Sequence, residues 1–176
     1  VQNSPEFSPA SKISFSQALI DCYGQMQADI CRKDLDNWLW ASSACRTFLS
    51  LFTKRDDHDG LVFTLNQDLF LEQYYARDMG KVVMPGIEYP NEWFQGNAVN
   101  PLGTEKAIRL PRESDLLEAQ CRFQNRGDSE LVYIKLHGSY VWEGCNGQHA
   151  LVIGNAKADA IVREPLLVWY HNIFKD

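Results

Sequence analysis

The sequence predicts an α/β protein in which part of a parallel, Rossmann-like sheet follows an N-terminal helical region. Three observations indicate this class. Apolar residues recur at helical spacing through residues 1–58. Two short apolar runs, at 61–65 and 131–136, have the length and composition of buried strands. Each run is followed at once by polar residues, and in open α/β sheets ligands bind beyond the carboxyl ends of the strands.

Two helices are expected within residues 1–58. Ser14 and Gln17 have the spacing of a capping box, which would begin the first helix. Asp34 is placed to cap the second helix. The predicted apolar faces consist of Phe15, Ala18, Leu19, Cys22, Met26 and Ile30 in the first helix, and of Leu35, Trp38, Leu39, Cys45, Phe48, Leu49 and Phe52 in the second.

The Rossmann-like part is expected to occupy residues 60–176, where apolar runs alternate with turn-forming residues. Residues 112–128 are polar, and their secondary structure is left open. In chain order, the patterns predict a strand at 61–65 that is buried on both faces, a helix from Leu69, an irregular segment at 80–103, a short strand at 106–110, a strand at 131–136, a hairpin of 140–142 with 150–153, and a helix opened by Pro165.

Length and composition limit the classes of function. A chain of 176 residues with 45% hydrophobic and 23% charged residues is expected to form one globular domain. Its 17 basic and 23 acidic residues give a net charge of −6, which disfavours direct nucleic-acid binding. No apolar run approaches the ~20 residues that cross a bilayer. Val1 is not an initiator methionine and no signal pattern follows it, so we expect a cytoplasmic piece of a longer protein.

The five cysteines favour free thiols over a disulfide framework. They are odd in number, irregularly spaced and without a C-x-x-C pair. Mostly buried thiols in a reducing cytoplasm are therefore expected. The segment 56–60 contains three aspartates, a histidine and a glycine, and it favours a solvated turn over a metal site.

Polar side chains follow both main predicted strands. Asn66 and Asp68 come after the first, and His137 and Ser139 come after the second. At two adjacent strand ends, a histidine with an ordinary pKa near 6.5 would face carboxamide and carboxylate groups, which suits acid–base chemistry. Two structural readings stay open: Asp68 as a helix cap, and His137 as part of a tight turn that needs Gly138.

Two segments resemble the sirtuin superfamily. Residues 63–68, Phe-Thr-Leu-Asn-Gln-Asp, look like its T-x-N-x-D segment, and residues 135–139, Lys-Leu-His-Gly-Ser, look like its L-H-G segment. The wider pattern up to Phe174 is most similar to the sirtuin-like domains of bacterial antiphage systems, which include Thoeris effectors and short-Argonaute-associated proteins. The resemblance covers residues 60–176, whereas the N-terminal helices match only in type.

The resemblance implies an NAD site. By motif, Asn66 and Asp68 would line the nicotinamide-ribose part, and His137 would be the catalytic base. Loss of nicotinamide leaves an oxocarbenium-like ribose, so such a site must hold the ribose and supply a base. Asn66 would position the ribose or the attacking water, and Asp68 would bind the ribose or the carboxamide. Thr64 and Ser139 would either add hydrogen bonds to NAD or serve only as turn-formers.

Three departures from the family pattern bear on the activity. Only Cys145 follows the histidine, so the four-cysteine zinc module of deacylating sirtuins cannot form. Leu65 stands where a glutamine usually precedes the asparagine, which also disfavours a deacylase. The G-A-G-x-S phosphate loop and the closing G-x-x-F-x-D-x-H strand are missing from the sequence. We therefore expect residues 1–176 to be a single sirtuin-like domain, incomplete at both ends, that binds NAD weakly by itself.

The leading hypothesis is an NAD hydrolase that releases nicotinamide and ADP-ribose as an antiphage defence effector. NAD is then a substrate, and neither a cofactor nor zinc is expected. The expected partners are a fused domain or another protein of the defence system, and a second copy of the chain. The first alternative is a non-catalytic module that senses NAD or ADP-ribose or assembles with a partner. A protein deacylase is the third reading.

Overall fold

The computed structural model describes residues 9–32, 44, 47–53, 60–69, 71, 82–88, 107–125, 131–154 and 157–175. The helices are α1 Pro9–Arg32, the 3-10 helix η1 Ser50–Phe52, α4 Glu113–Gln124, α5 Lys157–Val162 and α6 Pro165–Lys175. The strands are β1 Leu61–Thr64, β2 Val82–Val83, β3 Ile108–Arg109, β4 Leu131–Lys135, β5 Gly138–Glu143 and β6 His149–Leu151.

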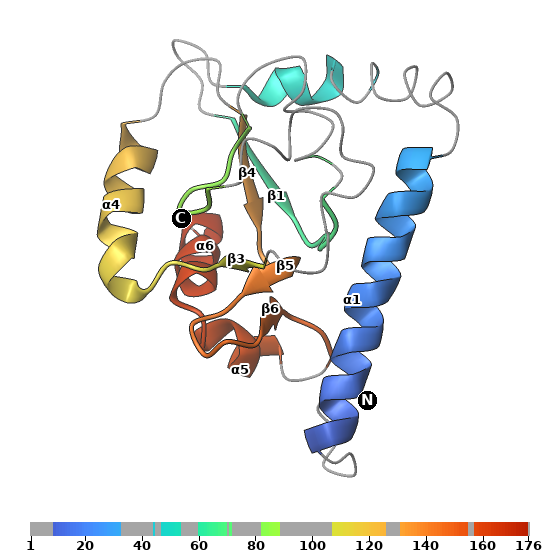
Figure 1. Cartoon of the computed structure of the whole chain (residues 1–176). Coiled ribbons are helices and arrows are strands. Elements are labelled where there is room, and N and C mark those ends of the chain that lie inside the picture. The colour runs from blue at the N-terminus through green and yellow to red at the C-terminus, as the bar shows by residue number, and fades with distance from the viewer. Residues whose placement is uncertain are drawn as a thin grey trace.

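A parallel sheet with the strand order β1-β4-β2 forms the first half of the structure. β4 is its central strand and pairs in parallel with both neighbours, with Thr64 opposite Lys135 on the β1 side. All five residues of β4 are buried, because strands flank it and α6 and η1 pack against it. Mixed helix and strand content around a parallel sheet confirms the predicted α/β class (Figure 1).

A second sheet with the order β3-β5-β6 follows directly from the first. The chain leaves β4, turns at Leu136 and His137, and enters β5 at Gly138. Gly138 has a φ of 74°, in the left-handed region that favours glycine. β5 and β6 form the expected antiparallel hairpin, and β3 pairs in parallel with β5. The turn therefore places His137 between the two sheets.

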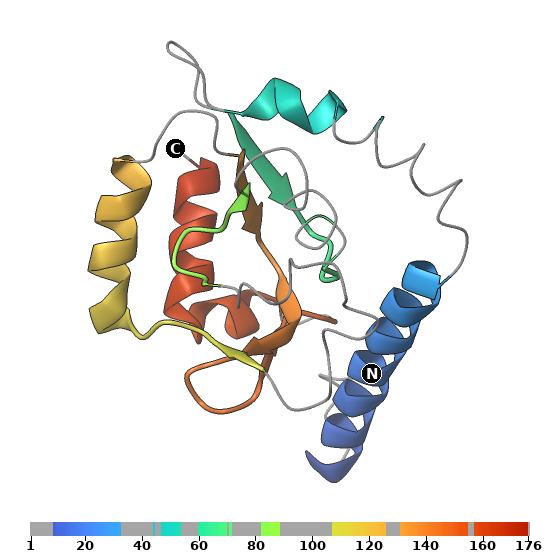
Figure 2. The same ribbon diagram turned by 45° about the horizontal axis from the view of Figure 1, so that its top comes forward.

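Helices pack on two sides of this framework. α6 contacts β4 and is covered in turn by α4, whereas α1 contacts β5 on the other side. Figures 1 and 2 show α4 and α6 together on one side and α1 alone on the opposite side. Leu166, Leu167 and Tyr170 of α6 are fully buried, and the Tyr170 hydroxyl donates to the Pro85 carbonyl at 2.6 Å. α6 therefore anchors the turn that follows β2.

The predicted strands at 106–110 and 131–136 and the helix from Pro165 are confirmed as β3, β4 and α6. The open segment 112–128 contains α4. The irregular segment predicted at 80–103 contains β2, which lacks any sequence signal because a two-residue strand depends on its partner β4. Within that segment, residues 89–103 lie outside the described residues.

The prediction that β1 is buried on both faces was wrong. All four residues of β1 are only half-buried, because β1 lies at the edge of the described sheet. The helix expected from Leu69 does not begin at that residue, since Leu69 lies in a bend and is fully buried. Leu71 is helical, and residues 70 and 72–80 lie outside the described residues.

The capping box predicted at Ser14 and Gln17 was also wrong. α1 begins at Pro9, so both residues lie inside the helix, where the Gln17 side chain donates to Asp21 Oδ1 at 2.9 Å. Asp34, the predicted cap of the second helix, lies outside the described residues.

The predicted apolar faces of both N-terminal helices are confirmed only in part, at Leu19, Leu49 and Phe52. Leu35, Trp38 and Leu39 lie outside the described residues. In α1, Leu19, Ile20 and Tyr23 pack against the core, whereas Cys22 and Met26 are exposed. In the second helical segment Leu49 is buried against β4 but Phe48 is 58% exposed. Helical spacing alone did not distinguish neighbouring residues that differ by one step around the helix.

The thiols are free as expected at Cys22, Cys121 and Cys145, but these three cysteines are exposed rather than buried. Cys45, the side chain of Cys31 and residues 56–59 of the predicted turn lie outside the described residues. In the described part of the chain, every helix is too short or too polar to cross a membrane.

Candidate functional site

The two polar segments predicted after the main strands lie next to each other at the carboxyl ends of β1 and β4. The Leu136 amide donates to the Thr64 carbonyl at 2.9 Å, which continues the β1–β4 pairing past the end of both strands. Residues 65–69 therefore lie beside the turn that carries His137. The side chain of Asn66 is exposed, and those of Asp68 and His137 are half-buried. None of the three is fully buried.

Gln67 connects these two segments, although its side chain is only 7% exposed. Its amide group donates to the carbonyl oxygens of His137 at 3.2 Å and of Val152 at 3.0 Å. The backbone carbonyl of Gln67 accepts hydrogen bonds from the Ser139 hydroxyl at 3.0 Å and from the Tyr140 backbone amide at 3.2 Å. Neutral hydrogen bonds of this kind contribute about 1 kcal/mol each, and an unsatisfied buried partner costs more.

The hydroxyl groups of Thr64 and Ser139 hold the backbone of this region. Thr64 Oγ1 accepts the amide of Asn66 at 3.0 Å, which tightens the turn directly after β1. Ser139 is fully buried, and its hydroxyl donates to the Gln67 carbonyl. The contact of Thr64 matches the turn-former, one of its two predicted roles, whereas Ser139 lies in β5 and holds a loop 72 residues away in the chain.

Lys135 also holds the loop 65–69, from the end of β4. It is fully buried at the end of β4, and its ammonium group donates to the carbonyl oxygen of Asp68. A buried ammonium group needs such partners because burial without them is costly. The loop 65–69 is therefore held by two buried polar side chains, from Gln67 and Lys135.

Tyr23 links α1 to the loop. Its ring stacks on Tyr140 of β5 with centroids 5.5 Å apart, and its hydroxyl donates to Gln67 Oε1 at 3.2 Å. Burial, followed by the negative charge of Asp68, raises the pKa of Tyr23. The Asp68 carboxylate is thus close enough to α1 to be felt electrostatically.

His137 is held in the neutral form by its surroundings. Burial lowers its pKa below the ordinary 6.5, and the positive charges of Lys157 and His171 lower it further. His171 belongs to α6, and its Nε2 lies 3.0 Å from the Leu136 carbonyl oxygen. A neutral imidazole at pH 7 can accept a proton, as a general base must.

This shift makes stability depend on pH. Because the folded pKa is below the unfolded 6.5, the unfolded chain binds more protons as pH falls through 6.5. The contribution of neutral His137 to stability is complete above that pH and is lost below it. We expect the free energy of unfolding of wild type, relative to His137→Gln, to fall between about pH 8 and about pH 5 in denaturant titrations. An unchanged difference would contradict the lowered pKa.

Four residues around the site were not predicted from the sequence: Gln67, Lys135, Tyr23 and His171. A lysine inside the apolar run of β4 was the one available signal, since a charged residue at a buried strand position requires a partner. Gln67 carries no such signal, because its burial depends on the β4–β5 turn about 70 residues later in the chain. Of the predicted residues, only Ser139 is buried, whereas Asn66 is exposed and the others are half-buried. Gln67 and Lys135 hold the loop that carries Asn66 and Asp68.

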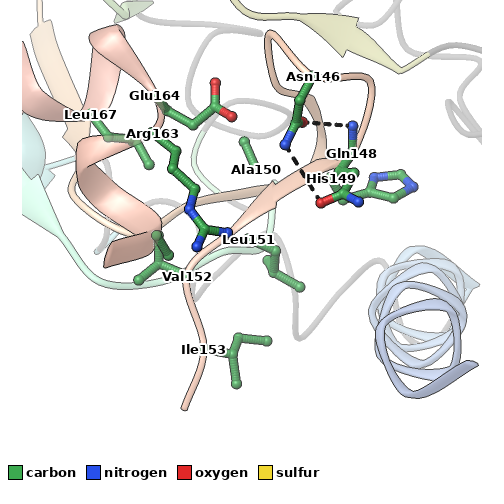
Figure 3. A pocket seen from close by; sticks show the side chains of 11 residues that line it. Asn146, Gln148, His149, Ala150, Leu151, Val152, Ile153, Arg163, Glu164 and Leu167 are labelled. Carbon is green, nitrogen blue, oxygen red and sulfur yellow. Dashed lines mark hydrogen bonds between the residues drawn. The ribbon is translucent and has the colours of Figure 1, made fainter. Parts of the chain in front are cut away.

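A pocket of about 130 Å³ lies elsewhere, between β6 and the junction of α5 with α6 (Figure 3). Figure 3 shows Arg163 extending from this junction towards Leu151 and Val152. Glu164 is 6% exposed and accepts the Cys145 amide of the hairpin turn at 3.1 Å. The pocket is lined by residues 146 and 148–153 of the hairpin and by Ala160, Arg163, Glu164 and Leu167. It adjoins the Gln67 network at Val152 but does not include Asn66, Asp68 or His137.

Within the described ranges, histidine, cysteine and acidic side chains form no group of three or more that could hold a metal ion. Comparison with protein-family models, with curated proteins and with solved structures found no match for this chain. The candidate site therefore depends on its own geometry and on the resemblance of its two motifs.

Proposed function

We propose that this protein is an NAD glycohydrolase that releases nicotinamide and ADP-ribose at the carboxyl ends of β1 and β4. The observation that carries the proposal is the pairing of these strands, which brings the Asn66–Asp68 segment beside the His137 turn. Ligands of open α/β sheets bind at this end of parallel strands. An exposed carboxamide, a carboxylate and a neutral imidazole are the groups that ribose binding and proton removal need.

The reaction needs few protein groups. Water adds to the ribose carbon as its bond to the nicotinamide nitrogen breaks, and that electron pair neutralises the pyridinium ring. His137 accepts the proton that the water loses. Asn66 orients the ribose or the water, and Asp68 binds a ribose hydroxyl or the carboxamide. NAD is the substrate, and the proposal includes no cofactor and no zinc.

The same proposal includes a sirtuin-type Rossmann-like fold and a role as a cytoplasmic effector in bacterial antiphage defence. Both rest on the resemblance of residues 63–68 and 135–139 to the sirtuin motifs. The parallel β1–β4 pair and the α/β architecture support the fold part of it. The expected partners are a fused domain or another defence protein, and a second copy of the chain.

Product analysis of the full-length protein incubated with NAD tests the activity. We expect nicotinamide and ADP-ribose in equal amounts by chromatography, with the His137→Ala protein as the control for contaminating hydrolases. NAD binding without turnover would instead identify a sensing or assembly module. NAD consumption that requires an acylated peptide would identify a deacylase. Either outcome would overturn the proposal.

A further inference from the structure

We propose that Gln67 is a positioning residue, which holds Asn66 and Asp68 in the correct place relative to His137. The inference rests on the proposed function, and it names a residue to which the NAD-site motifs assign no role. Gln67 is only 7% exposed, so we assign it no direct contact with the substrate. It acts through the segments that it joins.

The contacts of Gln67 reach both sides of the site. Its side-chain amide donates to the backbone carbonyl of His137, the proposed base, and to that of Val152. These two residues are already paired, since the Val152 amide donates to the His137 carbonyl at 3.0 Å. The side-chain amide of Gln67 therefore connects the loop 65–69 both to the β4–β5 turn, at His137, and to the chain after β6, at Val152.

The position of Gln67 in the chain makes this tie specific to the site. Gln67 lies between Asn66 and Asp68, so a shift of its backbone moves both proposed substrate-binding groups. Its backbone carbonyl accepts hydrogen bonds from Ser139 and Tyr140, and its side-chain Oε1 accepts one from the Tyr23 hydroxyl. Hydrogen bonds from α1, β5 and the β4–β5 turn thus converge on one residue.

Kinetics of Gln67→Met test the role, since methionine keeps the length of the side chain but cannot donate. Small displacements of reacting groups reduce catalysis strongly, so we expect kcat to fall by about 10- to 100-fold, with a smaller rise in KM because Asn66 and Asp68 also bind the substrate. Gln124→Met, at an exposed position at the end of α4, is the matched control and should keep wild-type kinetics. A kcat per folded molecule equal to that of wild type would overturn the proposal.

A second measurement separates this inference from the proposed activity. The ring of His137 can be titrated by NMR whether or not NAD is cleaved. Loss of the Gln67 tie should loosen the turn, expose the ring to water and raise the pKa of His137 towards 6.5. An unchanged titration in Gln67→Met would refute the positioning role, whereas a raised pKa without NAD cleavage in wild type would refute only the hydrolase.

Tyr23→Phe keeps the test decisive if Gln67→Met does not fold. This change keeps the ring that stacks on Tyr140 but removes the hydroxyl that donates to Gln67 Oε1. We expect a smaller loss of kcat and a smaller rise in the His137 pKa, because both amide donations of Gln67 remain. The absence of both changes in a folded Tyr23→Phe protein would overturn the proposal in this case.

Discussion

Replacement of His137 or Asn66 by alanine should each lower the rate of NAD cleavage by at least about 100-fold, the usual contribution of a general base or a comparable group. His137→Ala removes the proton acceptor, and Asn66→Ala removes the group that orients the ribose or the water. Both proteins should still fold, because Asn66 is exposed and His137 is half-buried in a turn. Nicotinamide release and thermal melting are measured on the same preparations.

A structural role for these residues predicts a different pattern. Both changes would then lower the melting temperature, and the remaining activity would follow the fraction of folded protein. His149→Ala is the matched control, since His149 is an exposed histidine on β6. Full cleavage of NAD by well-folded His137→Ala would rule out the role proposed for this residue.

Gly138→Ala should cause a large loss of stability at the entry to β5. A Cβ atom at this position would lie 1.9 Å from the backbone oxygen of Ala150, and the φ of 74° is unfavourable for alanine. The left-handed conformation costs about 1–2 kcal/mol, and overpacking adds typically about 1–3 kcal/mol. Chemical denaturation should therefore show the free energy of unfolding reduced by about 2–5 kcal/mol.

Gly147→Ala separates the two contributions. Gly147 has the same φ of 74°, but the nearest atom to its added Cβ, Glu143 Oε1, lies at 3.7 Å, which is an ordinary contact. It should therefore show only the conformational cost. If Gly138→Ala is no more destabilising than Gly147→Ala, the result would contradict the close contact between Gly138 and the backbone of Ala150.

Much of the fold could be predicted because its signals are local. The apolar run at 131–136 was long and β-branched enough to identify β4, and Pro165 marked the first residue of α6. β2 could not be predicted, since it is two residues long and is defined only by pairing with β4. The error at β1 has the same origin: burial depends on the neighbours of a strand.

The sequence by itself placed candidate polar side chains after two strands: Asn66, Asp68 and His137 were chosen from residue type and position, and their proposed roles come from the resemblance to the sirtuin motifs. The tertiary structure decided that these strands are adjacent and parallel, and that Gln67, Lys135 and Tyr23 hold the loop 65–69 that follows β1. The physical reason is the range of the interactions. A polar side chain is buried only where distant segments supply its hydrogen-bond partners, and Gln67 finds them in α1, in the β4–β5 turn and after β6.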